Sequence, residues 1–284
     1  RHAAAEDALE RIRVEYELLP PVVNPTQALA DGAPLVFEQH GSNVMQQRTF
    51  TWGEVERVFA AADHVVRSHF RWNRVGANPM ETFGCICQWH LADDSVSCHG
   101  AYQTPRFMAL GRALSLNLPT NKVRVIASPQ GGAFGGKGGP RGSEIAALLS
   151  RKAGGRPVKY IEDRSEYLLA GGSQSWDRYY DAELAVQGDG RVTGLRVRLV
   201  DDQGAGGEGY AAIATAKPLA AFTGCYRIEA AAYDMTLVAT NRAPTYPYRG
   251  YGPPPHYVVL ESLMDMAARR LELDPAELRR RNYI

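Results

Sequence analysis

The stretch that decides the fold is a glycine-rich loop, Gln130-Gly131-Gly132-Ala133-Phe134-Gly135-Gly136-Lys137-Gly138-Gly139. The β-branched run Lys122–Ser128 precedes it and predicts a strand, and Glu144–Lys152 follows it with helical composition. Glycine adopts positive φ and lets backbone N–H groups approach a ligand closely. Successive N–H groups ahead of a helix N-terminus form a concavity that suits an anion, such as a phosphate or an oxo group on a metal.

Two other interpretations of this loop stay open at this point. From Gly131 to Lys137 the spacing nearly matches a P-loop, which would indicate a nucleotide hydrolase. A P-loop needs Ser or Thr after its lysine to hold Mg²⁺, whereas this chain has Gly138, and the apolar Phe134 is unusual in a triphosphate cradle. The loop could also be a glycine-rich surface turn that binds nothing.

Composition excludes several classes of protein. The 284 residues are 45% hydrophobic and 22% charged, which is ordinary for a globular protein and rules out disordered or collagen-like chains. The 32 basic and 31 acidic side chains give a net charge of +1, without the basic excess of a nucleic-acid-binding surface. No apolar run reaches the ~18 residues that a membrane helix needs. We therefore expect no nucleic-acid partner and no membrane span.

The four cysteines indicate free thiols in a reducing compartment rather than a disulfide scaffold. Cys85 and Cys87 lie two residues apart in a strand-like run, so they share one face of a sheet. A zinc site would need a C-x₂₋₄-C spacing and a second ligand pair, and the C-x-C spacing here does not supply them. Buried structural thiols are therefore favoured. The first residues show no secretory segment, and we expect a cytoplasmic protein.

Hydrophobic periodicity predicts an α+β fold in which helices are interleaved with mixed, mostly antiparallel sheets. The predicted strands are Val14–Leu19, Val65–Trp72, Thr82–His90, Ser95–Tyr102, Lys122–Ser128, Pro157–Glu162, Tyr179–Val186, Arg191–Val200 and Ala231–Thr240. The predicted helices are Ala3–Arg13, Trp52–His64, Pro105–Leu118, Glu144–Lys152 and His256–Leu271, with a capped helix start at Asp274. Asn24–Phe50 has weak periodicity and predicts a long connection.

Several other motifs accompany the glycine loop. Upstream, Gly100–Pro105 predicts a strand that delivers Gln103 at a turn into a helix. The others are Met80-Glu81-Thr82, Arg156-Pro157-Val158-Lys159, Glu162-Asp163-Arg164-Ser165-Glu166, Thr240-Asn241-Arg242-Ala243-Pro244, Tyr248-Arg249-Gly250-Tyr251-Gly252 and Leu278-Arg279-Arg280-Arg281-Asn282. In this order and at these spacings, the set resembles the molybdopterin-binding large subunit of the molybdenum hydroxylases. These are the xanthine dehydrogenase, aldehyde oxidase and carbon monoxide dehydrogenase family.

The resemblance covers nearly the whole chain and implies a domain organisation. Residues 1–23 would be the tail of the small α/β, hammerhead-like domain that precedes the molybdenum domain, and residues 24–60 a connecting segment. Residues 61–284 would be the first molybdopterin-binding domain. The chain is then expected to be part of a longer large subunit. Its expected partners are the remaining large-subunit segment or chain, an iron–sulfur subunit and an FAD subunit.

The resemblance also implies which residues would bind a molybdopterin, either plain or in its cytosine dinucleotide form. They are Gln103, Gly131, Gly132, Ala133, Phe134, Gly135, Arg249 and Arg281. The molybdenum would be held by the pterin dithiolene, with no direct metal ligand from the protein. Gln103 and Arg249 would be the catalytic side chains of this chain, and the base glutamate is expected outside it.

Each of these roles has a chemical reason and a simpler alternative. As a neutral amide, Gln103 would polarise the apical oxo group of the metal without adding charge, or it would only cap a turn. The charged fork of Arg249 would orient a carbonyl or stabilise negative charge on the substrate, or it would form a surface ion pair. Arg281 would approach the pterin, or it would belong to a solvated basic face.

The implied activity is hydroxylation of an aldehyde or N-heteroaromatic substrate with water as the oxygen source, with electrons passed to iron–sulfur and flavin centres. Two departures from the family pattern limit the expected substrates. Gly138 stands where many purine- and aldehyde-oxidising members carry an acid, which argues against xanthine as substrate. The loop Tyr246–Tyr251 lacks the cysteine that binds copper in carbon monoxide dehydrogenases. The alternatives are a carbon monoxide dehydrogenase large subunit and a non-catalytic partner subunit of the same fold.

Overall fold

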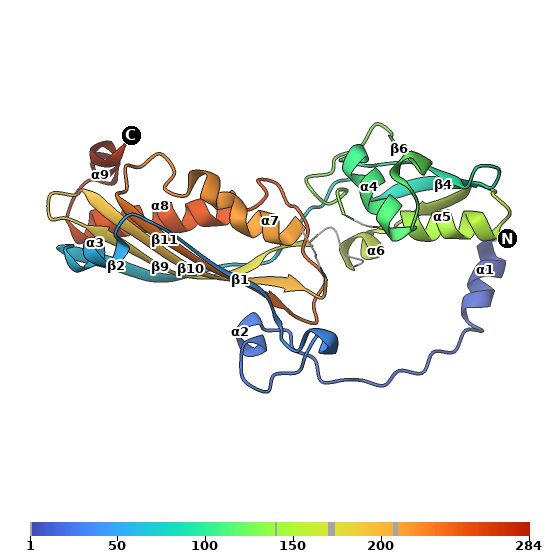
Figure 1. Ribbon diagram of the computed structural model, residues 1–284, viewed down its shortest axis with the longest axis horizontal. Helices are drawn as coiled ribbons and strands as arrows, with labels where there is room; N and C mark the ends of the chain where they lie inside the picture. Colours follow the sequence, from blue (N-terminus) through green and yellow to red (C-terminus); the bar gives the residue numbers. More distant parts are fainter. Residues whose placement is uncertain (1, 140, 170–173, 207–209) are drawn as a thin grey trace.

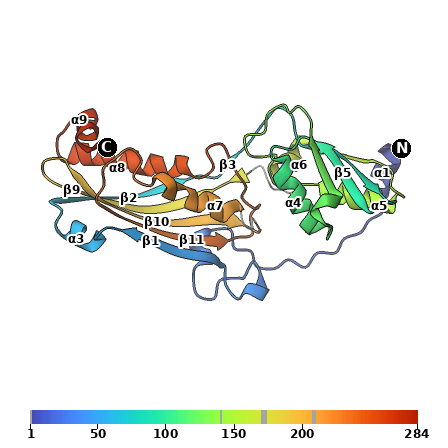
Figure 2. The same ribbon diagram turned by 45° about the horizontal axis from the view of Figure 1, so that its top comes forward.

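The chain forms two sheet-and-helix lobes that lie end to end (Figure 1). The computed structural model describes residues 2–139, 141–169, 174–206 and 210–284. A two-stranded ribbon, β3 (Val75–Gly76) with β8 (Gln174–Ser175), lies between the lobes (Figure 2). We name the lobes after their larger sheets, the five-stranded lobe and the four-stranded lobe.

The five-stranded lobe is built on a mixed sheet in the order β1-β11-β10-β9-β2. The strands are β1 (Val44–Trp52), β2 (His64–Trp72), β9 (Asp177–Val186), β10 (Val192–Gly204) and β11 (Ala230–Ala239). Only the β10–β11 pair of this sheet is parallel. The predicted hairpin at Gly188-Asp189-Gly190 joins β9 to β10.

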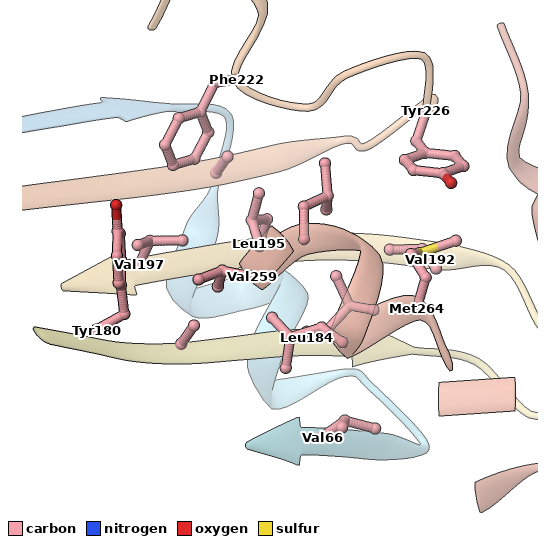
Figure 3. Packing of buried hydrophobic residues seen from close by; sticks show 14 of the residues in the cluster. Val66, Tyr180, Leu184, Val192, Leu195, Val197, Phe222, Tyr226, Val259 and Met264 are labelled. Atoms are coloured by element: carbon pink, nitrogen blue, oxygen red, sulfur yellow. The ribbon is translucent and has the colours of Figure 1, made fainter. Parts of the chain in front are cut away.

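The two faces of this sheet carry helices of different size. Leu184 and Leu195 pack with Val259 of α8 (Pro253–Arg270), and Figure 3 shows the three converging between the sheet and that helix. Ala185 and Ala230, whose side chains alternate to the opposite face, pack with α3 (Val55–Ala60). The remaining helical segments described in this lobe are α2 (Pro25–Ala28), η1 (Glu38–His40), α7 (Tyr210–Ala216), η3 (Lys217–Ala221) and α9 (Pro275–Asn282).

The four-stranded lobe has the strand order β6-β5-β4-β7, with β5–β6 parallel and the other pairs antiparallel. The strands are β4 (Gly84–His90), β5 (Ser95–Gly100), β6 (Val123–Ala127) and β7 (Val158–Ile161). The helical segments are α4 (Pro105–Ser115), η2 (Thr120–Lys122), α5 (Ser143–Lys152) and α6 (Arg164–Leu169). Helices α4 and α5 cover the apolar face of the sheet.

The thiols of this lobe lie in its core. Cys87 and Cys98 face each other across β4 and β5 with their Sγ atoms 3.1 Å apart, and Cys85 is buried beside them. The prediction of buried free thiols is therefore confirmed for three cysteines, whereas Cys225 is exposed. Among the described residues, no cluster of His, Cys, Asp or Glu could hold a metal ion.

The predicted α+β class with mixed, mostly antiparallel sheets is confirmed, and four local predictions are wrong. Val14–Leu19 forms no strand, because no described strand lies beside it to accept its backbone hydrogen bonds. The expected connection Asn24–Phe50 contains most of β1, which pairs with β11. The helix expected over Trp52–His64 is only α3, because Trp52 ends β1 and His64 begins β2. The N-terminal helix α1 (His2–Leu9) ends before the expected Arg13.

None of the helices in the described ranges is long and apolar enough to cross a membrane.

Candidate functional site

The glycine loop follows β6, and the backbone of a second segment packs directly against it. Gly135 has φ +101°, and a Cβ built there would lie 2.0 Å from the carbonyl oxygen of Pro247. A Cβ on Gly139 would lie 2.7 Å from the ring of Tyr246. The loop therefore needs glycine both for its left-handed backbone and for its close contact with the segment that leads to Arg249.

The side chain of Gln103 is oriented by the loop. Its Oε1 accepts a hydrogen bond from the backbone N–H of Gly135 at 2.9 Å. Only the oxygen of an amide can accept, so the orientation of this amide follows from its partner. The Nε2 group has no hydrogen-bond partner among the described residues and is available to donate to a ligand. The backbone N–H of Gln103 donates to the carbonyl of Lys137 at 3.2 Å, so both the backbone and the side chain of Gln103 are bonded to the loop.

The loop offers three successive backbone donors. Within the described ranges, the N–H groups of Gly132, Ala133 and Phe134 have no acceptor. These residues are partly or fully exposed, and the positive φ values of Gly132 (+89°) and Phe134 (+51°) turn the backbone sharply. Such a run of unpaired N–H groups fits an anionic or oxo acceptor.

Arg249 and Phe134 come together although 115 positions separate them in the sequence. The guanidinium Cζ of Arg249 lies 5.8 Å from the ring centroid of Phe134, whose side chain is 46% exposed. Among the described residues, Arg249 makes no ion pair with a carboxylate. The arrangement thus presents an apolar ring and an uncompensated cation next to the donors of the loop.

A buried ion pair supports the segment that carries Arg249. Arg178 and Asp201 are fully buried, and Arg178 Nε donates to Asp201 Oδ2 at 2.9 Å. Arg178 Nη1 also donates to the carbonyl of Gly252 at 3.0 Å, at the point where α8 begins. Since Gly252 lies three residues after Arg249, this contact anchors the segment against the five-stranded sheet.

One carboxylate contacts both ends of the glycine loop. Glu81 Oε2 accepts from the backbone N–H of Gly131 at 2.9 Å and from Lys137 Nζ. The hydrogen bond from Lys137, opposed by partial burial and assisted by Gly131, holds the pKa of Glu81 below its ordinary value. The side chain of Lys137 is fully buried, so it does not face a ligand as the lysine of a P-loop would.

A second buried pair holds the middle of the loop. Arg141 donates through Nε (3.0 Å) and Nη2 (2.6 Å) to the carbonyl of Gly136, and through Nη1 to Glu162. The guanidinium also lies 4.3 Å from the ring centroid of Tyr167. Sequence reasoning assigned no role to Glu81, Arg141 or Glu162. The signal was present, since Glu81 and Glu162 lie in motifs that carry the family resemblance.

Arg281 lies far from the loop in this chain. It sits on α9, at the opposite end of the molecule from β6 and α5 (Figures 1 and 2). Its Nε donates to Glu277 at 3.0 Å and its Nη1 to the carbonyl of Asp189 at 2.7 Å. The structure therefore brings together Gln103, the loop from Gly131 to Gly135, and Arg249, and leaves Arg281 apart.

Known proteins share this architecture. Residues 36–283 match the model of the molybdopterin cofactor-binding domain, and the chain belongs to this family. It is 33% identical to the nicotine 6-hydroxylase large subunit of Paenarthrobacter nicotinovorans, over 99% of this chain and 35% of that protein. It is also 33% identical to the carbon monoxide dehydrogenase large chain of Hydrogenophaga pseudoflava, over 99% of this chain and 37% of that protein.

Solved structures of named oxidoreductases superpose on this chain. Quinoline 2-oxidoreductase from Pseudomonas putida 86 superposes with a TM-score of 0.91 at 35% identity, covering 100% of this chain and 36% of that one. Aldehyde oxidoreductase from Desulfovibrio gigas superposes with a TM-score of 0.90 at 27% identity, covering 100% of this chain and 31% of that one. The chain thus spans about a third of the length of the relatives it matches.

Proposed function

We propose that this chain supplies one wall of the cofactor site in a molybdenum hydroxylase that oxidatively hydroxylates an organic substrate with water as the oxygen source. One observation carries the proposal. The glycine loop presents the unpaired N–H groups of Gly132 to Phe134. Beside them lie the oriented amide of Gln103 and the cation of Arg249. Because residues 36–283 match the molybdopterin cofactor-binding domain, these groups would serve an anionic cofactor that bears a metal oxo group.

Three side chains of this chain would each have a separate role at the site. A bound molybdopterin would supply a metal-activated oxygen nucleophile and accept the electrons. Gln103 would donate through Nε2 to the metal's oxo group while Gly135 fixes the amide. Phe134 would form an apolar wall that excludes water. Arg249 would orient the substrate or stabilise its developing negative charge. The base glutamate would come from the remaining large-subunit segment or chain.

The substrate class follows from what the site lacks. Gly138 is buried and carries no carboxylate for a purine ring, and Tyr246–Tyr251 contains no cysteine for copper. Relatives named for nicotine and quinoline act on N-heteroaromatic compounds. We therefore favour an N-heteroaromatic or aldehyde substrate. The carbon monoxide dehydrogenase reaction is the second candidate, because two large chains of that name match at 33% and 32% identity.

The proposal includes partners, since several matched relatives are named as subunits of larger complexes. Electrons would pass to iron–sulfur clusters and FAD on partner chains, and the pterin would be either plain or in its cytosine dinucleotide form. A cytoplasmic location remains a prediction from the free cysteines.

Elemental and pterin analysis of the assembled complex tests the proposal. We expect about one molybdenum and one pterin per large subunit, and turnover of an aldehyde or N-heteroaromatic compound in an activity screen with an artificial electron acceptor. Copper together with oxidation of carbon monoxide would favour the second candidate. Fully assembled complex without molybdenum and pterin would refute the proposal and indicate a non-catalytic subunit of this fold.

A further inference from the structure

The contact between Glu81 and Lys137 has no place in the proposed chemistry, yet it sits at the base of the loop. A single oxygen, Oε2, receives both the Gly131 N–H and the Lys137 ammonium group. Fifty positions separate Glu81 from Gly131 and 56 separate it from Lys137. A Cβ on Gly131 would lie only 2.7 Å from Glu81 Cβ, so the backbone has to approach this side chain closely.

The two residues that Glu81 binds are the ends of the segment that presents the donors. Gly131 directly precedes Gly132, where the run of unpaired N–H groups begins. Lys137 accepts the backbone N–H of Gln103 through its own carbonyl, at 3.2 Å. Displacing either end would therefore move the donors of Gly132 to Phe134 or the amide of Gln103.

The two partners of this ion pair differ in their burial. The Lys137 side chain is fully buried, whereas that of Glu81 is 45% exposed. Within the described residues, Glu81 is the carboxylate that pairs with Lys137. A buried ammonium group requires a counter-charge and hydrogen-bond acceptors, so Lys137 has one favourable position, which is fixed by Glu81.

We propose that Glu81 is a positioning residue that closes the loop Gly131–Lys137 into the shape that retains the pterin, and that Lys137 acts as its internal tether rather than as a phosphate ligand. The inference rests on the proposed function. It assigns a role to the Met80-Glu81-Thr82 motif and to the lysine of the P-loop-like stretch, to which the proposed chemistry gives no part.

The test uses the full-length large subunit assembled with its partners. Pterin is released, oxidised to its fluorescent form and counted per large subunit, and circular dichroism and thermal unfolding report folding. For Glu81→Gln we expect about a tenfold or larger fall in pterin content, as is typical when a supporting contact at a metal site is removed. The matched control is Glu229→Gln, which neutralises a carboxylate in the exposed ion pair with Arg57 and should keep the wild-type content.

A double variant separates positioning from simple neutralisation of a buried charge. Glu81→Gln with Lys137→Met leaves no unpaired buried charge but also removes the tether, so the pterin content should stay low while the complex folds. Wild-type pterin content in Glu81→Gln, or its return in the double variant, would overturn the inference alone. Wild-type complex without pterin would instead overturn the proposed function, and this inference with it.

Discussion

The buried pair of Arg141 and Glu162 gives the sharpest quantitative prediction. In Glu162→Gln the shape of the side chain is kept and its oxygen can still accept from Arg141 Nη1, but the negative charge is gone. Both side chains are essentially inaccessible to solvent. The guanidinium would then keep the Gly136 carbonyl and the Tyr167 ring, without an anion beside it among the described residues.

Two opposing contributions set the change in the free energy of unfolding for Glu162→Gln. Removing one partner of a buried ion pair costs about 3–5 kcal/mol, because the remaining charge stays desolvated. The hydrogen bond that the glutamine retains recovers about 1 kcal/mol. We therefore expect the free energy of unfolding to fall by about 3 kcal/mol, which lowers the ratio of folded to unfolded protein about 100-fold.

Urea unfolding of the purified protein measures this change as a lower transition midpoint at constant slope. Glu229→Gln, in the exposed pair with Arg57, is the control and should lose less than about 1 kcal/mol. The double replacement Arg141→Met with Glu162→Leu leaves no buried charge but also removes both hydrogen bonds to the Gly136 carbonyl, so it should recover only part of the loss. A Glu162→Gln protein within about 0.5 kcal/mol of wild type would refute the assignment of this pair as a buried ion pair, since surface changes stay within that range.

Three further predictions concern the loop and the core. Gly135→Ala should destabilise the protein by more than the ~1–2 kcal/mol that left-handed backbone costs a residue with a Cβ, because the new atom meets Pro247; thermal unfolding measures it. Gln103→Leu should reduce kcat about 100-fold in the assembled enzyme, which is the typical effect of losing one preorganised donor. His256 is buried against Phe222, and burial lowers its pKa from 6.5 to about 4. Because the unfolded chain binds this proton first, the histidine's contribution to stability is complete above pH 6.5 and is lost as pH falls towards 4. It should amount to about 3 kcal/mol and be absent in His256→Phe, as measured by urea unfolding across this range.

Each of these has its own control or contrary result. Gly111→Ala, in α4 with open space around it, should leave stability equal or slightly higher, so an equal loss at both glycines would contradict the close contact at Gly135. Unchanged kcat in Gln103→Leu would show that the amide does not act at the reaction centre. An identical acid slope in wild type and His256→Phe would mean that His256 is not buried in its neutral form.

Most elements that depend on local pattern could be predicted from the sequence. The cap at Asp274 is one, since its Oδ1 accepts from the N–H groups of Ala276 and Glu277 as the spacing indicates. Elements that depend on a distant partner could not. Strand β1 has little alternation of its own and is stabilised by pairing with β11, about 185 positions away. Val14–Leu19 shows the converse, since an alternating pattern forms no strand when no neighbour lies beside it.

The residues of the candidate site also differ in whether the sequence alone predicts them. The glycine loop and Gln103 are recognisable because glycine content and motif spacing are properties of short segments. The supporting carboxylates were missed because their partners are defined only in space, as for Glu81 with Lys137 and Glu162 with Arg141. The meeting of Arg249 with Phe134 likewise depends on the close approach of Gly135 to Pro247.

The most direct test of the central claim is to locate the metal in the assembled enzyme. Anomalous diffraction at the molybdenum absorption edge would mark its position without reference to the polypeptide. Our account predicts one peak per large subunit, beside the Nε2 group of Gln103 and the ring of Phe134, with pterin density along Gly131 to Gly135. A peak elsewhere in the complex, with none beside this loop, would contradict it.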